Sequence, residues 1–374
     1  MQAALSADGA GEIPAVICYE GIYYRDHWDE ITECPWWYAL SSDVECQLAW
    51  RREAIAKTPQ DWFSLPVGAS REDRERVRIE VRADGVWELD AATGEARLLE
   101  RPPVGGALIE EARESAGGPP PQSPEEIDVS VAVPGEFDEE EFRQSGRGEL
   151  AELMLEEFGR DLFPMVSVPS PFWCLYYLWG FEGMMTTAAT EPELVRYACE
   201  RYLARVTHSL KRAAAMGARG VWIEECLTDS LSPAMFADLN LPLVRRVVDE
   251  IRLGGMKSVY YYCGNPNDRW EELFAAGADA LSLEESKKGF SIDIDAVVEK
   301  ADGRSGVFGN LDAIGLLESG SEQELAAEVS RQVAAGRENG SRFVMSIGSP
   351  VTPGTSAARV RLYYDLAREM SAAR

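Results

Sequence analysis

Polar side chains that can move protons follow several short apolar runs in the second half of the chain. Glu224 and Glu225 end one such run, and Glu284 and Glu285 end another. Carboxyl groups gathered in one cleft can differ in pKa, so that one serves as an acid and another as a base. Adjacent strand residues point to opposite sides, so one member of each pair is expected to face a site. We take Glu225 and Glu284 as candidate catalytic groups; pairing with arginine or lysine, or capping of a helix, is the structural alternative.

A tyrosine and a thiol end another apolar run. Tyr261 can donate hydrogen bonds or act as an acid. Cys263, two residues later, has a sulfur atom of the kind that zinc accepts, as it also accepts carboxylate oxygen. Cys263 and Glu225 are therefore candidate zinc ligands and Tyr261 is a candidate catalytic group, with ordinary core packing as the alternative.

A histidine and an arginine lie in an aromatic-rich segment near the N-terminus. His27 follows the first predicted strand and is a candidate acid–base group, whereas His208 lies within a predicted helix and is expected to be structural. Arg25 can hold a substrate carboxylate through paired hydrogen bonds. It could equally neutralise Asp26 or Asp29.

Two clusters of aromatic residues, around positions 28–37 and 172–179, suit an apolar or ring-bearing ligand, with core packing as the alternative. The residues that we expect to contact a substrate are Glu20, Tyr23, Arg25, Phe172, Trp173, Asn265, Asn310 and Ser349.

Strands and helices in alternation must position these side chains. Apolar runs predict strands near residues 15, 127, 163, 220, 258, 279, 306 and 342, and helical patterns separate the later runs. Parallel strands that are covered on both faces are apolar throughout their length. In a closed (β/α)8 barrel, the functional groups lie at the carboxyl ends of the strands. The sequence therefore predicts an α/β fold, a single (β/α)8 TIM-type barrel with its site at that end.

One segment in the first half of the chain has a different pattern. Charged and apolar residues alternate on both sides of an Asp84–Gly85 pair, which is typical of a β-hairpin. We expect one barrel over residues 1–374, with residues 71–101 as an antiparallel hairpin insertion within it, and we interpret Gly117–Pro124 as a loop.

The composition narrows the class of partner. The 374 residues carry a formal net charge of −27, and 45% of them are hydrophobic. This charge repels nucleic acid and anionic membranes, so we expect neither as a partner. The N-terminal residues lack the pattern of a secretory signal, and the seven cysteines show no tight pairing. We therefore expect a cytoplasmic protein with a small-molecule substrate, and we leave a homodimer open.

Three blocks of the chain resemble the uroporphyrinogen decarboxylase superfamily. They lie at Ser232–Asn265, Gly309–Asp312 and Phe343–Pro353, and the likeness runs over roughly residues 160–370. The resemblance implies a (β/α)8 barrel with its site at the carboxyl end. True decarboxylases of this superfamily carry an early Arg-Gln-Ala-Gly-Arg-Tyr motif, and this chain has Tyr19–Trp28 (YEGIYYRDHW) instead.

The missing motif, and a hairpin that ends in Arg101–Gly106, favour the methyltransferase-like branch. That branch implies transfer of a methyl group from a small methylated substrate, for which an aromatic compound is one candidate, to a cobamide carried by a corrinoid protein. Its thiol-alkylating members hold zinc with a His-x-Cys pair and a later cysteine, and the corresponding residues here are Tyr261, Cys263 and Ser349. A different zinc set of Glu225, Cys263 and Glu284 is a hypothesis.

Two other functions stay open at this point. One is a cofactor-free decarboxylase or lyase that acts on a non-porphyrin acid, with Arg25 at the carboxylate and Tyr261 or a glutamate as the proton donor. The other is a non-catalytic relative that only binds a ligand.

Overall fold

The structure is a computed structural model that describes residues 1–105, 120–287 and 289–373. The loop predicted at Gly117–Pro124 therefore lies partly outside the described residues, as does Gly106 at the end of the predicted hairpin.

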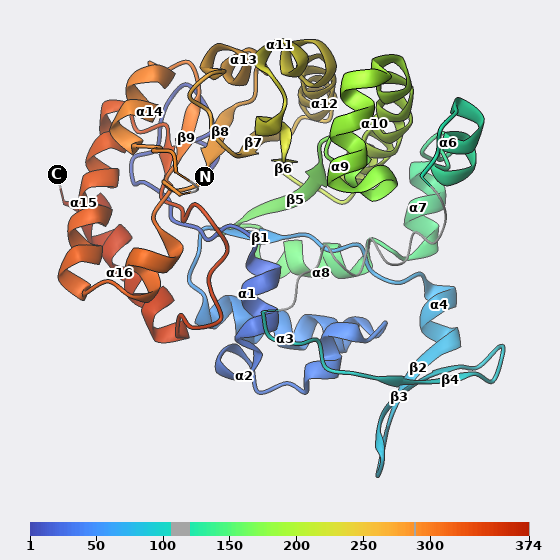
Figure 1. Cartoon of the computed structure of the whole chain (residues 1–374). Coiled ribbons are helices and arrows are strands. Elements are labelled where there is room, and N and C mark those ends of the chain that lie inside the picture. The colour runs from blue at the N-terminus through green and yellow to red at the C-terminus, as the bar shows by residue number, and fades with distance from the viewer. Residues whose placement is uncertain (106–119, 288, 374) are drawn as a thin grey trace.

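A curled sheet of seven parallel strands is the centre of the described fold (Figure 1). Each strand pairs in parallel with the next along the sheet. The order is β1 (Trp62–Ser64), β5 (Phe163–Pro169), β6 (Gly220–Cys226), β7 (Lys257–Cys263), β8 (Ala280–Leu283), β9 (Gly306–Phe308) and β10 (Phe343–Val344).

An extended N-terminal segment lies between the two edges of this sheet. The Val16 N–H donates to the Met345 carbonyl at 2.9 Å, and the Met345 N–H donates to the Pro14 carbonyl at 2.7 Å. On the other side, the Asp61 N–H donates to the Ala15 carbonyl at 3.0 Å, and the Ala15 N–H donates to the Asp61 carboxylate at 2.7 Å. The segment thereby takes an eighth position around the sheet, and the predicted α/β barrel is confirmed.

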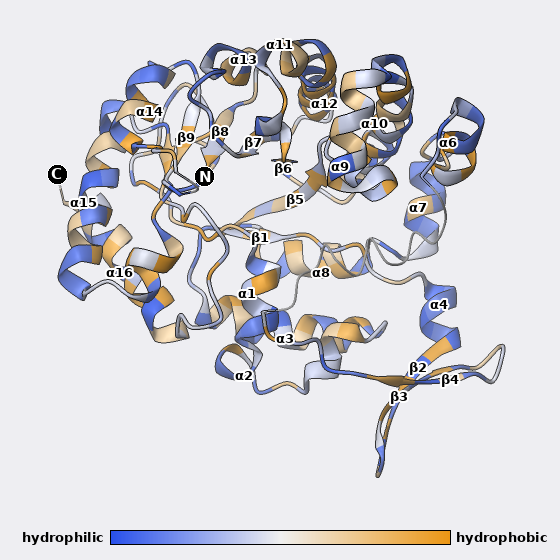
Figure 2. Cartoon of the chain, in the orientation of Figure 1, coloured by the Kyte–Doolittle hydropathy of each residue, from blue (hydrophilic) through white to orange (hydrophobic). Residues whose placement is uncertain are grey.

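Helices surround the strands and complete the core (Figure 1). Hydrophobic residues lie along the strands and on the helix faces that pack against them (Figure 2). The helices that follow β5 are α9 (Leu175–Thr190), α10 (Pro192–Ala215), η2 (Thr228–Ser230), α11 (Pro233–Met235), η3 (Phe236–Asn240), α12 (Leu241–Leu253), α13 (Trp270–Ala275), α14 (Ile294–Ala301), η4 (Ala313–Glu318), α15 (Glu322–Glu338) and α16 (Ala357–Ala372). Those that precede β5 are α1 (Glu20–Asp26), α2 (Trp28–Ile31), η1 (Trp36–Leu40), α3 (Val44–Lys57), α4 (Arg71–Arg76), α6 (Pro124–Ser130), α7 (Glu139–Ser145) and α8 (Glu149–Phe158).

Helix α12 shows how the sequence specifies these helices. Val244, Val247, Val248 and Ile251 are buried, and their spacing of three and four residues places them on one face. That face packs against the barrel wall, whereas Arg245 on the opposite side is exposed. No helix among the described residues is both long enough and apolar enough to cross a membrane.

The strand predicted near residue 127 is wrong, because this segment forms α6. The Ser123 side chain accepts a hydrogen bond from the Glu126 N–H, and Pro124 occupies the first turn. Ile127 and Val131, four residues apart, are the buried members of the segment. The second barrel strand is instead β1, which has only three residues and so shows no recognisable pattern in the sequence.

A separate antiparallel sheet extends away from the barrel (Figure 1). It consists of β2 (Val77–Arg82), β3 (Gly85–Asp90) and β4 (Ala96–Leu99). Gly85 has a φ of +146°, which side chains rarely permit, so the turn between β2 and β3 depends on glycine.

The two glutamates at the end of β6 face opposite sides of the barrel wall. Glu224 borders an internal cavity, whereas Glu225 is buried between the strands and the surrounding helices. The Glu225 carboxyl accepts hydrogen bonds from Ser170 Oγ at 2.9 Å, Asn240 Nδ2 at 2.7 Å and Tyr260 Oη at 3.2 Å. Burial outweighs these three donors and raises the pKa of Glu225 to about 7.

We expect Asp61→Ala to lower the free energy of unfolding by about 2 kcal/mol, because it leaves the Ala15 N–H without its carboxylate acceptor. Asp61→Asn keeps an acceptor oxygen and should cost roughly half as much. Urea denaturation of both variants measures the difference. Equal stability of the natural chain and Asp61→Ala would contradict the closure of the barrel through this contact.

A second prediction concerns how the free energy of unfolding depends on pH. The pKa of Glu225 is about 7 in the folded chain against the ordinary 4.5, so the native state keeps a proton that the unfolded chain releases between these values. The stability due to this group is complete below pH 4.5 and is lost as the pH rises through 7, by on the order of 3 kcal/mol. Glu225→Gln should remove this decline when unfolding free energies are measured from pH 5 to 8. An unchanged pH dependence would show that Glu225 is ionised in the folded chain throughout this range.

Candidate active site

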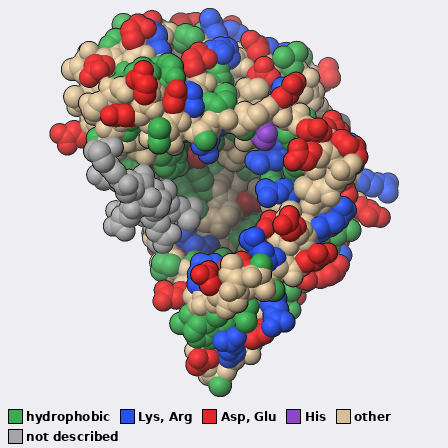
Figure 3. Space-filling model, turned by 90° about the vertical axis from the view of Figure 1, so that its right-hand side faces the viewer, with side chains coloured by type: hydrophobic (Ala, Val, Ile, Leu, Met, Phe, Trp, Pro, Cys, Tyr) green, Lys and Arg blue, Asp and Glu red, His purple; other side chains and the backbone are tan. Residues whose placement is uncertain are grey.

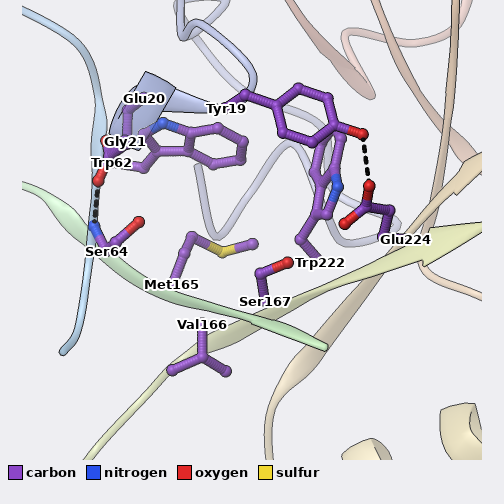
Figure 4. Close-up of a pocket in the computed structure, with 10 residues that line it drawn as sticks. All are labelled: Tyr19, Glu20, Gly21, Trp62, Ser64, Met165, Val166, Ser167, Trp222 and Glu224. Carbon is purple, nitrogen blue, oxygen red and sulfur yellow. Dashed lines mark hydrogen bonds between the residues drawn. The ribbon is translucent and has the colours of Figure 1, made fainter. Parts of the chain in front are cut away.

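A cavity of about 190 Å³ lies inside the barrel, beside the start of α1 and strands β1, β5 and β6. Its apolar walls include Tyr19, Trp62, Met165 and Trp222. Figure 4 shows the two tryptophans and the tyrosine around one space, with Glu20 at one side and Glu224 at the other. The remaining lining residues are Gly21, Ser64, Val166 and Ser167. Of the ten described lining residues, none is lysine or arginine.

Tyr19 connects the N-terminal segment to the carboxyl end of β6. Its hydroxyl donates to Glu224 Oε1 at 3.0 Å. The Tyr19 backbone is left-handed, with a φ of +54° and a ψ of +44°, a conformation that is uncommon for an aromatic residue. Such strain persists where surrounding contacts fix the residue, and it concentrates at functional sites. The strained backbone at Tyr19 therefore marks this end of the cavity as a functional candidate.

Glu224 is the polar group at the inner end of the cavity. Burial raises the pKa of Glu224, and the hydrogen bonds from Tyr19 and Cys226 oppose that rise. The Cys226 sulfur lies 3.7 Å from Glu224 Oε1. In the empty cavity, Glu224 therefore stays protonated to a higher pH than an exposed glutamate.

Aromatic rings fix the shape of the cavity. Trp222 stacks on Tyr261, with ring centroids 4.9 Å apart and planes inclined by 25°. The ring of Trp62 meets that of Trp222 nearly at right angles, at 5.7 Å and 81°. The Tyr19 ring also meets Trp222 edge to face, at 6.5 Å and 73°. Each of these rings therefore packs against another ring in the wall of the cavity.

The residues do not fit the zinc site implied by the family resemblance. Cys226 and Cys263 are partners in the β6–β7 register, but Tyr261 and Ser349 replace two of the expected ligands. No three His, Cys, Asp or Glu side chains within the described ranges lie close enough to hold a metal. The hydrogen bond with Cys263, together with burial, raises the pKa of the Cys226 thiol. A protonated thiol is a poor zinc ligand.

Several predicted site residues meet at the ends of β8, β9 and β10 instead of at the cavity. Lys287 Nζ lies 2.7 Å from Glu284 Oε1 and also contacts Ser349 Oγ. Ser349 Oγ donates to Glu285 Oε2 at 2.7 Å. Asn310 Nδ2 donates to the Glu284 carbonyl at 3.1 Å. The structure thus brings Glu284, Asn310 and Ser349 together around a lysine.

Tyr261 lies between this lysine cluster and the cavity. Its ring stacks on Trp222, and its hydroxyl donates to the Gly348 carbonyl at 3.1 Å. Tyr261 therefore supports the cavity wall, although it is not among the lining residues.

His27 is a buried contact between the beginning and the end of the chain. Its Nδ1 lies 2.9 Å from Glu30 Oε1, and its Nε2 lies 3.2 Å from the Thr352 carbonyl. The ring of Tyr23 packs beside it at 4.8 Å. Arg25 pairs with Asp26 at 2.7 Å. None of these five side chains lines the cavity with Glu224.

Arg25 borders a second hollow of about 150 Å³, whose lining includes Trp28, Trp36 and Trp50. Gly21 lines both hollows, and a Cβ placed there would meet nothing within 4 Å. The described residues therefore leave the border of the main cavity open at Gly21, and we call this border the lip. Figure 3 shows one face of the molecule hollowed, with hydrophobic side chains in the depth and lysine and arginine near the edge.

The other predicted residues lie apart from the cavity. Phe172 is fully buried, and Trp173 stacks on Tyr176 at 5.2 Å. The Asn265 N–H donates to Asp229 at 3.4 Å. Glu225 lies behind the barrel wall, so the side chain of this predicted catalytic residue does not border the cavity, whereas that of its neighbour Glu224 does.

Sequence reasoning overlooked Tyr19, Trp62 and Trp222 and chose Glu225 rather than Glu224. Trp222 stands two residues before Glu224 on the same strand, and this spacing of two places both on one face. This spacing is the signal in the sequence that could have shown that Glu224 lies beside an aromatic side chain of the cavity wall. Trp62 lies on a strand too short to be recognised.

Comparisons with known proteins agree with this fold. "Uroporphyrinogen decarboxylase 2, chloroplastic" of Oryza sativa subsp. japonica is 22% identical over 232 residues, which cover 59% of this chain and 56% of that protein. A uroporphyrinogen decarboxylase of Xanthomonas campestris pv. campestris is 26% identical over 198 residues, 51% of this chain and 54% of that protein. The chain thus spans about half the length of these curated relatives.

A solved structure is similar along nearly the whole chain. A methyltransferase from Methanosarcina mazei superimposes with a TM-score of 0.66 at 18% identity, over 98% of this chain and 96% of that chain. At 18% identity, this similarity shows that the two chains share a fold and shows nothing more. The sequence matches the family described as "Uroporphyrinogen decarboxylase (URO-D)" over residues 109–370. Because this match covers more than half of the chain, the protein belongs to the uroporphyrinogen decarboxylase family.

Proposed function

We propose that this protein transfers a methyl group from a small methylated compound, bound in the cavity beside Glu224, to a corrinoid carried by a partner protein. The observation that supports this most is the cavity itself. It has about 190 Å³, aromatic walls, two carboxyl groups and, among its described lining, no lysine or arginine. Sites for drug-sized ligands have roughly 300–1,000 Å³. A tetrapyrrole with several carboxylates is too large and has the wrong charge for this cavity.

The residues of the chain bind and orient the donor. Trp62 and Trp222 provide apolar faces that hold a methylated group and exclude water from it. Tyr19 donates to Glu224 and so holds that carboxyl group at the cavity, where it faces the heteroatom from which the methyl group departs. The bond between carbon and heteroatom breaks, and its electron pair stays on the heteroatom.

A corrinoid would need access to the donor from outside the cavity. The open lip at Gly21 provides a route, because no side chain of the described residues would meet a Cβ at that position. When its carrier protein is bound, the corrinoid supplies a nucleophilic metal centre that accepts the methyl group. The described residues of this chain contribute the donor site and the opening.

Loss of carbon dioxide from a non-porphyrin acid is less well supported. A carboxylate substrate needs a cation beside it. Arg25, the predicted partner, borders the neighbouring hollow and not the cavity with Glu224. The charge of the cavity lining therefore favours methyl transfer over decarboxylation.

The test is a methyl-transfer assay with purified protein, a reduced corrinoid protein and a panel of small methylated donors. We expect at least one donor to change the absorbance of the corrinoid in the way that methylation does. Glu224→Gln should lower the rate by roughly 10²-fold, because it changes the group that faces the leaving heteroatom. Gly21→Leu should slow transfer while donor binding is retained, since it narrows the lip and leaves the inner wall unchanged.

Glu200→Gln is the matched control, because it makes the same chemical change at an exposed residue paired with Arg246. It should leave the rate unaltered. Release of carbon dioxide from an acid, with no methylation of the corrinoid by any donor, would contradict the proposal.

A further inference from the structure

We infer that the methyl donor is a small methylated ammonium ion, held in the aromatic cavity by its positive charge. The inference rests on the proposed methyl transfer and names the substrate class of the same site.

Ring orientation is the first reason. The Trp62 and Trp222 planes are inclined by 81°, and the Tyr19 and Trp222 planes by 73°. Rings set nearly at right angles around one space surround a guest from several sides (Figure 4). The face of an aromatic ring carries negative electrostatic potential, and cages of such rings recognise quaternary ammonium groups. A neutral apolar guest would gain packing from these walls but no attraction between charge and ring.

Charge is the second reason. Glu20 and Glu224 lie on different sides of the cavity, and no lysine or arginine is present among its described lining residues (Figure 4). Glu20 is held by the Ser64 N–H at 2.8 Å and by Gln60, so its position is fixed. An anionic ligand would meet two carboxyl groups here. A cation makes favourable contacts with both.

The protonation of these carboxyl groups is coupled to the charge of the ligand. Burial raises the pKa of Glu20 and the pKa of Glu224, because it penalises the charged form of each carboxyl group. A bound cation favours the ionised forms, so binding releases protons and becomes tighter as the pH rises. A neutral donor would show no such gain.

The titratable and charged groups around the two carboxyl groups belong to several elements. Those that interact electrostatically with Glu224 are Tyr19, Cys226, Tyr177, Cys174 and Cys18. Those that interact with Glu20 are Arg51, Tyr24 and Tyr364. Arg51 does not line the cavity that contains Glu224; it lines a neighbouring hollow together with Glu20. Its positive charge favours the ionised form of Glu20 and so opposes the rise in the pKa of Glu20.

The chemistry of such a donor is balanced. The bond between nitrogen and the methyl carbon breaks, and its electron pair stays on nitrogen. A quaternary ammonium ion thus leaves as a neutral tertiary amine and needs no proton, and both electrons of the new bond to the methyl carbon would come from the reduced corrinoid of the partner protein. The amine product has lost the positive charge of the donor and therefore binds less tightly to the aromatic rings of the cavity, which favours its release.

The experiment compares choline with 3,3-dimethyl-1-butanol, its neutral isostere, by isothermal titration calorimetry on the full chain. We expect choline to bind at least tenfold more tightly, which corresponds to about 1.4 kcal/mol. Its affinity should rise as the pH is raised above the ordinary pKa of a glutamate, and titrations in buffers of different ionisation heat should detect released protons. Equal affinities for the two compounds would overturn the inference, and this comparison requires no variant.

Variants make the test specific to the cavity. Glu224→Gln should weaken choline binding about tenfold and leave the isostere unchanged. Glu200→Gln, on the surface, should leave both unchanged. Equal weakening of both compounds by Glu224→Gln would indicate loss of shape and count against charge recognition.

The assignment of substrate class and the proposed function can fail separately. Methylation of the corrinoid by methoxy compounds, with no binding of ammonium ions, would overturn the assignment and leave methyl transfer standing. Tight, pH-dependent binding of choline with no methylation of the corrinoid by any donor would overturn the proposed function and, with it, the role of the ammonium ion as methyl donor, and would leave only its recognition by the cavity.

Discussion

The hydrogen bond from Tyr19 to Glu224 is the contact on which the cavity depends. It joins the segment that completes the barrel to the strand that carries the buried carboxyl group. The left-handed backbone at Tyr19 is maintained because the same segment pairs with Met345 on one side and with Asp61 on the other. Closure of the barrel and formation of the cavity are therefore one event. Strain at a single residue is offset by contacts with both edges of the sheet.

The two glutamates at the end of β6 show how one strand supplies two different functions. Glu225 faces three hydrogen-bond donors between the sheet and the helices and has no access to the cavity. Glu224 faces aromatic rings and open space. Both have a raised pKa because both are buried, but only Glu224 can exchange its proton for a ligand. Burial alone therefore does not identify a catalytic carboxyl group; the face of the strand does.

Much of the fold could be predicted from the sequence, because buried parallel strands are apolar along their whole length. The runs at β5 to β9 follow this rule. β1 has only three residues, too few to show the apolar pattern of a buried strand. The apolar residues of α6 also fit a strand, but its capping residues, Ser123 and Pro124, start a helix. The site was harder to predict. A Glu-Glu pair does not show which member faces inward, and the partner of His27 is a carbonyl 325 residues away.

The N-terminal segment has a consequence for synthesis on the ribosome. The Val16 carbonyl accepts a hydrogen bond from the hydroxyl of Tyr363, which is 347 residues later, and the Val16 N–H donates to the Met345 carbonyl. At ~5–20 residues per second, translation separates the two by tens of seconds. During that interval the nascent chain has an incomplete ring, and both edges of its sheet are unpaired. Edges of this kind can pair with other chains. Helix α16 is made long after the N-terminal segment, so the hydrogen bond from its Tyr363 can hold this segment in place only once that interval has passed.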